Sequence, residues 1–410
     1  MGKDFWKKEK VKKYLTYDDV NIVPKYSKLK SREDVKLNTR FTKNTELTIP
    51  IVASPMDTVT EVDMAKEMLE WGGVGVIHRF MSIEKQAHMI KSLHYEWDRY
   101  FDISKNMGGD VEERTIDKEW DEWYESVKHW NSPPTKSDWK DLKDRFYWAD
   151  GMIKDEEIWK KRPLCAAVGV TGDYLERARE LVWNGCNVIL IDVAHGHHKL
   201  VGEAIEEIKK DISNIEVVAG SVATGDGAEF LCEKGADALR VGIGNGSLCE
   251  TRIRTGVGLP SVTALLDVCS VADGYNVPVI ADGGIRNVGD VCKGLGCGAD
   301  TIMVGSLLSG TKESPGTIEK KGQWPNEQLH KKYRGSASRD SKGNDKNVEG
   351  NHKVIPYKGK VKRILHDIRD GIRSSCSYVG ASNLEEYRSL VEFVEVTRAG
   401  QVEAQPHLLT

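Results

Sequence analysis

The sequence lacks several features that mark whole classes of proteins. None of its apolar runs approaches 18 residues, so no segment is expected to span a membrane. The 59 basic and 63 acidic residues leave a net charge of −4, which excludes a broad basic field that would recruit nucleic acid or an anionic membrane. The charged first 13 residues contain no apolar core, so we expect no secretory signal peptide.

The eight cysteines form neither a disulfide pattern nor a metal-binding pattern. No Cys-x-x-Cys pair is present, and no Cys/His spacing typical of a metal site. Seven of them mostly lie within apolar helix or strand patterns: Cys165, Cys186, Cys232, Cys269, Cys292, Cys297 and Cys376. We therefore expect a reduced, cytoplasmic protein.

The sequence also lacks a Gly-x-Gly-x-x-Gly motif after a first predicted strand. This absence excludes a nicotinamide cofactor bound in the Rossmann manner. What the chain does have is length and glycine. Its 410 residues can bury a sizeable core, and its 39 glycines suit a fold with many tight turns between strands and helices.

Short runs rich in β-branched residues and bounded by Gly, Asp or Pro predict eight strands. Most runs are continuously apolar, as expected of strands that are covered on both faces. Helical patterns fill the gaps, for example at 174–183, 200–210, 228–234 and 361–373. We predict an α/β fold, a (β/α)8 TIM barrel, with an open doubly wound sheet as the alternative. The predicted strands are 49–53, 74–77, 164–168, 187–191, 215–219, 237–241, 277–281 and 300–304.

Two segments interrupt the barrel pattern. Residues 93–162 are rich in charge and hold seven of the eleven tryptophans, so we predict an inserted helical subdomain after the second strand. It is either a lid or docking element or, as clustered Trp more often indicates, an elaboration with its own small core. Residues 336–356, dominated by Gly, Ser, Asn, Asp and Lys, predict a mobile active-site flap. The catalytic barrel then comprises residues 14–92 and 163–400.

The active site of such a barrel forms at the carboxyl ends of its strands. After the sixth predicted strand, residues 242–252 contain glycines that let the backbone approach a ligand or surround an ion with carbonyls. Cys249 lies in this loop. Inert packing is the default for a lone Cys, but the glycines and the neighbouring Ser247, Thr251 and Arg252 favour a nucleophile.

The loops after the seventh and eighth strands predict a nucleotide site. Asp282 suits a ribose diol, and the amides of Gly283 and Gly284 suit a phosphate. Gly305 and Ser306 follow the next strand, and phosphate sites built from these two loops recur in this architecture.

The loop after the fourth strand offers polar groups of a different kind. His195, His197 and His198 suggest a metal, but no Cys or carboxylate ligands accompany them. We favour a redox cofactor that lies beside Asp192.

Together these residues resemble the IMP dehydrogenase/GMP reductase family, from Tyr14 to about His407 apart from the insert and the flap. The resemblance implies a (β/α)8 barrel, usually a homotetramer, that acts on a purine nucleoside monophosphate with a nicotinamide cofactor. The motifs that carry it lie at 15–20, 54–59, 72–78, 242–252, 280–286, 333–335, 356–359 and 371–374.

The resemblance also implies residue roles. Cys249 would attack C2 of the purine to give a covalent thioimidate, and hydride would move between C2 and the nicotinamide. Thr251 and Glu349 match a proton-relay pair. The carbonyls of Gly244 and Gly246, with Cys249, match a loop that often binds a monovalent cation such as potassium. The implied cofactor-binding residues are Asp192, Ala194 and His195. The implied substrate-binding residues are Ser54, Met56, Ser247, Asp282, Gly283, Gly284, Gly305, Ser306, Tyr333 and Gly335.

The chain departs from the family pattern at several places. The family usually has Pro at the position of Asn245 and Thr at the position of Glu250. The insert of 93–162 is too short for the two CBS modules that many dehydrogenases carry there.

One further departure bears on the direction of the reaction. A dehydrogenase activates water with an Arg-Tyr pair on the flap, but the 21 residues between Gly335 and Tyr357 contain one Arg, Arg339, and no Tyr. We therefore predict a GMP reductase that converts GMP and NADPH to IMP, ammonia and NADP. The first alternative is an IMP dehydrogenase that converts IMP, NAD and water to XMP and NADH. The second is a silent sensor that binds a purine nucleotide.

Overall fold

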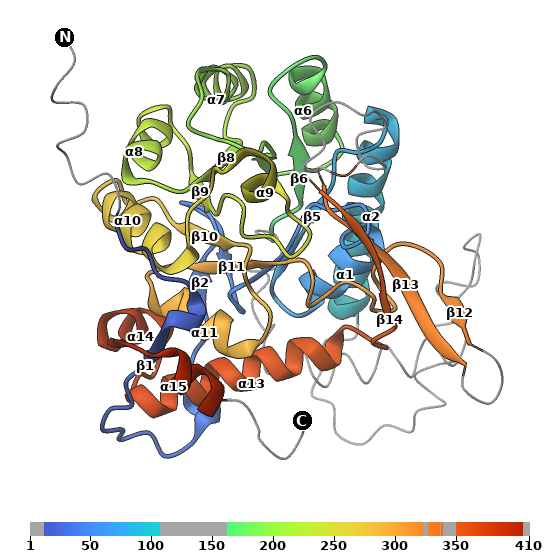
Figure 1. Ribbon diagram of the computed structural model, residues 1–410. Helices are drawn as coiled ribbons and strands as arrows, with labels where there is room; N and C mark the ends of the chain where they lie inside the picture. Colours follow the sequence, from blue (N-terminus) through green and yellow to red (C-terminus); the bar gives the residue numbers. More distant parts are fainter. Residues whose placement is uncertain (1–11, 107–161, 323–326, 337, 339–349, 405–410) are drawn as a thin grey trace, which may run out of the picture. The chain divides into compact units, whose positions relative to one another are not determined.

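The computed structural model describes residues 12–106, 162–322, 327–336, 338 and 350–404 (Figure 1). The chain divides into two compact units, Met1–His94 with Pro163–Thr410, and Tyr95–Arg162. Of the second unit, the structure describes the end of α2 (Ile83–Asn106) and Arg162. The predicted insert therefore lies mostly outside the described residues. Within the described part of the chain, no helix is both long and apolar enough to cross a membrane.

Eight parallel strands of the first unit close into a barrel, in the order β4 to β11 with β11 paired to β4 (Figure 1). Each predicted strand is present, with bounds shifted by up to three residues. The prediction of a (β/α)8 barrel is confirmed, and the open doubly wound sheet is excluded because no edge strand is left. The strands are β4 (Ile51–Ala53), β5 (Val74–Ile77), β6 (Cys165–Val168), β7 (Val188–Ile191), β8 (Glu216–Val222), β9 (Ala238–Val241), β10 (Val279–Asp282) and β11 (Thr301–Val304).

The strands are continuously apolar because helices cover their outer faces and one buried cluster fills the inside. That cluster draws a residue from every barrel strand, from Val52 on β4 to Met303 on β11. The principal covering helices are α1 (Val62–Glu70), α6 (Tyr174–Trp183), α7 (Lys199–Asp211), α8 (Gly225–Glu233), α10 (Ser261–Gly274), α11 (Val288–Gly296) and α13 (Lys362–Val379).

A hairpin closes the amino-terminal end of the barrel. It consists of β2 (Thr39–Arg40) and β3 (Glu46–Leu47), and it contributes Phe41 and Leu47 to the buried cluster. Thr45 Oγ1 donates to Glu216 Oε2 at 2.6 Å at the start of β8, and Thr39 Oγ1 donates to the Asp300 carbonyl at 2.8 Å before β11. The opposite, carboxyl-terminal end is therefore the one that can receive ligands.

Besides the β2–β3 hairpin, two further small sheets outside the barrel were not predicted. The first joins the two ends of the described chain, and the second lies beside the barrel mouth (Figure 1). Residues 337 and 339–349 of the predicted flap lie outside the described residues. Residues 352–356, the last five of the predicted flap, form strand β14 instead of irregular chain, because β13 offers them an edge to pair with. The strands are β1 (Val20–Ile22) with β15 (Phe393–Glu395), and β12 (Glu319–Lys321), β13 (Gln328–Arg334) and β14 (His352–Pro356).

Short helices complete the described chain. They are η1 (Tyr17–Asp19), η2 (Arg32–Asp34), α9 (Thr251–Thr255), α14 (Leu384–Leu390) and α15 (Arg398–Glu403).

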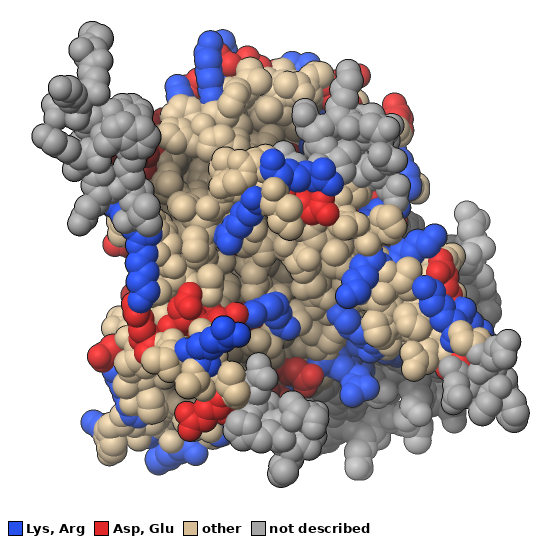
Figure 2. Space-filling model, in the orientation of Figure 1, with Lys and Arg blue, Asp and Glu red and all other residues tan. Residues whose placement is uncertain are grey.

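The face of the molecule in Figure 2 carries mixed charge. Lys and Arg are interspersed there with Asp and Glu, without a broad field of one sign.

Candidate active site

Gly305, directly after β11, is the centre around which several predicted nucleotide-binding side chains lie. A methyl group at this position would lie 3.2 Å from Met56 Sδ, 3.3 Å from Ser54 Oγ and 3.5 Å from Tyr333 Oη. Tyr333 Oη in turn lies 3.0 Å from Ser247 Oγ. Burial raises the pKa of Tyr333, so its hydroxyl stays protonated and can donate to an anion. The structure thus brings hydroxyl groups from separate loops to one point that glycine keeps open.

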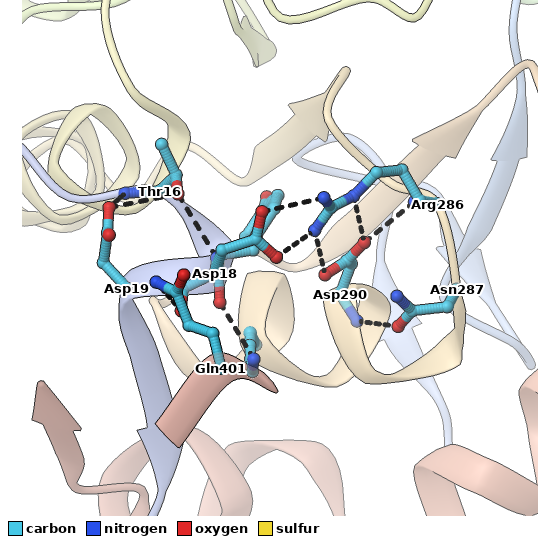
Figure 3. Close-up of polar contacts among 9 residues, drawn as sticks. Thr16, Asp18, Asp19, Arg286, Asn287, Asp290 and Gln401 are labelled. Atoms are coloured by element: carbon cyan, nitrogen blue, oxygen red, sulfur yellow. Dashed lines mark hydrogen bonds and ion pairs between the residues drawn. The ribbon is translucent and has the colours of Figure 1, made fainter. Parts of the chain in front are cut away.

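The loop after β10 is held from outside the barrel (Figure 3). Gly283 and Gly284 have φ values of +87° and +79°, a conformation that favours glycine. Arg286, which ends this loop, binds both carboxylate oxygens of Asp18 at 2.8 and 2.5 Å and donates from Nε to Asp290 at 3.1 Å. The hydrogen bonds from Arg286 hold the pKa of Asp18 below its usual value. The η1 segment therefore fixes the predicted phosphate loop.

Arg240 on β9 links the two predicted ligand-binding carboxylates. Its Nη1 donates to Asp192 Oδ1 at 2.9 Å, its Nε lies 3.5 Å from Asp282 Oδ2, and that Nε also donates to Ser221 Oγ at 3.0 Å. The side chain is 7% exposed, so the charges interact in a largely dry environment. Burial raises the pKa of Asp282, and Arg240 opposes that rise.

Arg240 was not among the predicted site residues. It lies within the predicted strand 237–241, at a position where no ligand-binding role was expected. The sequence did contain a signal for Arg240, because a charged side chain within an otherwise apolar barrel strand needs a buried partner. Asp192 is such a partner, and it also lies 3.7 Å from Arg79 Nε.

Cys249 lies half-buried in the loop after β9. Its Sγ donates to Thr251 Oγ1 at 3.1 Å, and its backbone N–H donates to the Gly246 carbonyl at 3.0 Å. The predicted neighbour Thr251 is therefore in contact with the thiol. Glu349, the predicted partner of Thr251, lies outside the described residues, whereas Gly350 forms an antiparallel bridge with Cys249.

The other cysteines are poorly suited to nucleophilic chemistry. All eight are free thiols, and all except Cys249 and Cys269 are buried. Burial raises the pKa of the other seven, so these thiols stay protonated near neutral pH. They are Cys165, Cys186, Cys232, Cys269, Cys292, Cys297 and Cys376.

The predicted cofactor loop after β7 carries Asp192 at the barrel mouth and exposes Ala194 and His195. Partial burial lowers the pKa of His195, so its imidazole tends to be neutral. Beside this loop a hollow of about 490 Å³ is lined by His197, His198, Lys199, Glu203, Glu206, Phe230 and Lys234. Among the described residues, no group of three or more His, Cys, Asp or Glu side chains could hold a metal ion.

The loop proposed to surround a monovalent cation contains a positive group of its own. Arg252 Nη2 donates to Asn245 Oδ1 and to the Leu259 carbonyl, and burial lowers the pKa of Arg252. The Gly246 carbonyl is already engaged by the Cys249 amide. Potassium binding at Gly244, Gly246 and Cys249 stays a prediction.

Comparison with known proteins settles the family. A family model described as "IMP dehydrogenase / GMP reductase domain" matches residues 14–407. The chain belongs to the IMP dehydrogenase/GMP reductase family. It is accordingly an NAD(P)-dependent oxidoreductase. Three similar relatives, each 36% identical, are the inosine-5'-monophosphate dehydrogenases of Nitrosopumilus maritimus, Cryptosporidium parvum and Borreliella burgdorferi. The alignments cover 97%, 96% and 97% of this chain and 98%, 95% and 97% of those proteins.

The prediction of a GMP reductase is wrong. Eight relatives at 32–36% identity, each covered over at least 95% of its length, are all named inosine-5'-monophosphate dehydrogenase. The prediction relied on a missing Arg-Tyr pair in one short segment. Such a pair concerns how water is activated, whereas the likeness to these dehydrogenases extends over nearly the whole chain. The preference for NADPH depended on the reductase prediction and loses its support with it.

Proposed function

We propose that the protein is an IMP dehydrogenase, which converts IMP, NAD and water to XMP and NADH. The observation that carries the proposal is the position of Cys249. Its thiol lies in the loop after β9, in contact with the Thr251 hydroxyl and two residues from Ser247 of the hydroxyl cluster around Gly305. A nucleophile beside an anion-binding cluster suits covalent catalysis on a nucleotide.

Substrate binding follows from the same geometry. The hydroxyls of Ser247 and Tyr333, with the backbone amides of the glycine loops, offer donors for the phosphate. Asp282 faces the mouth with a carboxylate for the ribose, and Ser54 and Met56 lie on the side of the base. The proposed phosphate-binding residues are Ser247, Gly283, Gly284, Gly305, Ser306, Tyr333 and Gly335.

In the proposed reaction Cys249 loses its proton and its sulfur bonds to C2 of IMP. Asp192, Ala194 and His195 would hold NAD, which would accept the hydride from C2 when bound. Water then attacks C2 of the thioimidate, and the Cys249 thiol departs to leave XMP. Because the flap has no Arg-Tyr pair, the Thr251 hydroxyl, 3.1 Å from Cys249 Sγ, is the group that we propose to relay the proton of water, together with Glu349.

We also propose how the chain is divided into a barrel, a flap and an inserted subdomain. Residues 14–92 and 163–400 form the catalytic barrel, 336–356 form the flap, and the insert 93–162 is a separate subdomain that is not a CBS pair. The family resemblance favours a homotetramer.

Nicotinamide absorbance tests the proposed reaction. Purified protein is given IMP with NAD in one cuvette and GMP with NADPH in another, each with and without potassium. We expect a rise in absorbance in the first cuvette and no change in the second. Loss of NADPH absorbance in the GMP cuvette without a signal from IMP would overturn the proposal.

A second prediction concerns the contact between Asp18 and Arg286. Asp18→Asn weakens the pair that holds the phosphate loop, so we expect the KM for IMP to rise about two- to fivefold with kcat nearly unchanged, the scale of an exposed ion pair of good geometry. The matched control is Asp211→Asn, which breaks the bidentate pair with Arg179 at 2.7 Å on the outer helices α6 and α7. An equal change in KM for both variants would contradict the assigned role of Asp18.

A further inference from the structure

The nucleophile loop is joined to the chain that immediately precedes β14. Cys249 and Gly350 form an antiparallel bridge, and the Asn351 amide donates to the Leu248 carbonyl at 3.1 Å. On its other side, the Asn351 carbonyl accepts from the Gly335 amide at 2.9 Å. Asn351 therefore lies between the Cys249 loop and the end of β13, which carries Tyr333 to the hydroxyl cluster.

A side-chain junction reinforces this backbone contact. Glu250 Oε1 accepts from Asn351 Nδ2 at 3.1 Å, while Oε2 accepts from Arg254 Nε at 2.7 Å. The Glu250 side chain is 21% exposed, so water competes only partly for these contacts. The Glu250 carboxylate thus contacts the chain before β14 through Oε1, while Oε2 is held by Arg254 of α9 in its own segment.

A shorter side chain could not make both contacts. Threonine would offer one hydroxyl where Glu250 offers two oxygens at the end of a longer chain. Cys249 lies between Leu248 and Glu250, and both of these neighbours are bonded to Asn351. Fixing the residues on either side of Cys249 restricts the backbone rotations that aim its thiol.

We propose that Glu250 and Asn351 form a positioning pair that aims the Cys249 thiol. Neither residue belongs to the proposed substrate- or cofactor-binding set, and the pair acts through the backbone of the nucleophile loop. Its catalytic consequence rests on the proposed function, whereas the contact itself does not. The expected signature is a lower kcat with a nearly unchanged KM for IMP, because the proposed phosphate and ribose residues other than Ser247 and Gly335 lie on other loops.

Two variants test the pair: a single variant that removes the hydrogen bond, and a double variant that exchanges its donor and acceptor. Asn351→Asp places two carboxylates opposite each other and retains the oxygen that accepts from the His352 amide at 2.8 Å. We expect kcat to fall about tenfold, the scale of one hydrogen bond to a charged group, and the KM for IMP to stay within about twofold. The double variant Glu250→Gln/Asn351→Asp restores the hydrogen bond with its polarity reversed and should recover kcat to within about threefold of the wild type.

Hydrogen–deuterium exchange provides a readout that needs no turnover. The Asn351 amide, bonded to Leu248, should exchange faster in Asn351→Asp and return towards the wild-type rate in the double variant. The matched control is Asn184→Asp, because Asn184 Nδ2 donates to Glu180 Oε1 at 3.0 Å at the end of α6, outside the site. This control should leave kcat and the exchange of residues 247–255 and 350–356 unchanged.

The outcomes separate this proposal from the proposed function. Equal exchange of the Asn351 amide in the wild type and in Asn351→Asp overturns the pair, whatever the activity. A double variant that stays as impaired in kcat as the single variant also overturns it. If the wild type does not oxidise IMP but the exchange rates follow the expected order, the proposed function fails and the contact stands.

Discussion

Replacing Cys249 by alanine is expected to lower the kcat for IMP oxidation by about 10⁴-fold or more, the scale seen when an enzyme loses its nucleophile. The phosphate, ribose and base contacts lie on other side chains, so binding of IMP should change by less than about threefold. The measurement is NADH formation, together with IMP affinity by calorimetry and the melting temperature as a check of folding.

Cys269→Ala is the matched control for this prediction. Cys269 is the other cysteine that is partly exposed, but burial raises its pKa and it lies on α10, outside the mouth of the barrel. Its replacement should leave kcat within about twofold. Loss of activity in Cys269→Ala but not in Cys249→Ala would place the chemistry at a different thiol.

Replacing Arg240 by methionine is expected to lower the free energy of unfolding by about 3–5 kcal/mol, because two mostly buried carboxylates lose their shared counter-charge. Asp192 and Asp282 would then face each other without the guanidinium between them. The KM for IMP should rise as well, since Asp282 is the proposed ribose ligand. Urea denaturation and steady-state kinetics measure the two effects.

The loss of stability in Arg240→Met should depend on pH. Burial already raises the pKa of Asp282, and without Arg240 that pKa rises further. A carboxyl group whose folded-state pKa lies above its unfolded value of about 3.9 binds protons more tightly in the folded state. Stability therefore falls as pH rises from the unfolded pKa through the raised folded one. We expect a smaller loss near pH 5 than near pH 7.5.

Arg179→Met serves as the control for the pH experiment. Its guanidinium pairs with Asp211 on the surface, so its removal should change the free energy of unfolding little, and equally at both pH values. An equal loss of stability in Arg240→Met at both pH values would contradict the assigned role of Arg240 beside Asp282.

The barrel could be predicted from sequence because its strands are short, continuously apolar and regularly followed by helical patterns. Helix α6 has the predicted bounds, 174–183, and all eight strands lie where expected. The small sheets could not be predicted in the same way. Strand β14 (352–356) is mostly exposed and depends on an edge supplied by β13, which is a tertiary and not a local property.

The candidate site was predictable where the chemistry lies in loops at strand ends. Ser54, Met56 and Tyr333 lie around Gly305, while their roles in binding a nucleotide stay predictions. Arg240 was missed because its role depends on two carboxylates from distant strands. The reaction direction was predicted wrongly because one absent residue pair outweighed the likeness of the rest of the chain.

In the proposed reaction Cys249 forms a covalent bond to C2 of IMP while NAD is reduced. The most direct test is to mix the enzyme with IMP and NAD, quench in acid within the first turnovers, and map the peptides by mass spectrometry. We predict that the Cys249 peptide carries the mass of IMP less two hydrogens, in an amount that depends on NAD. NADH formation without such an adduct, or an adduct on another residue, would contradict the account.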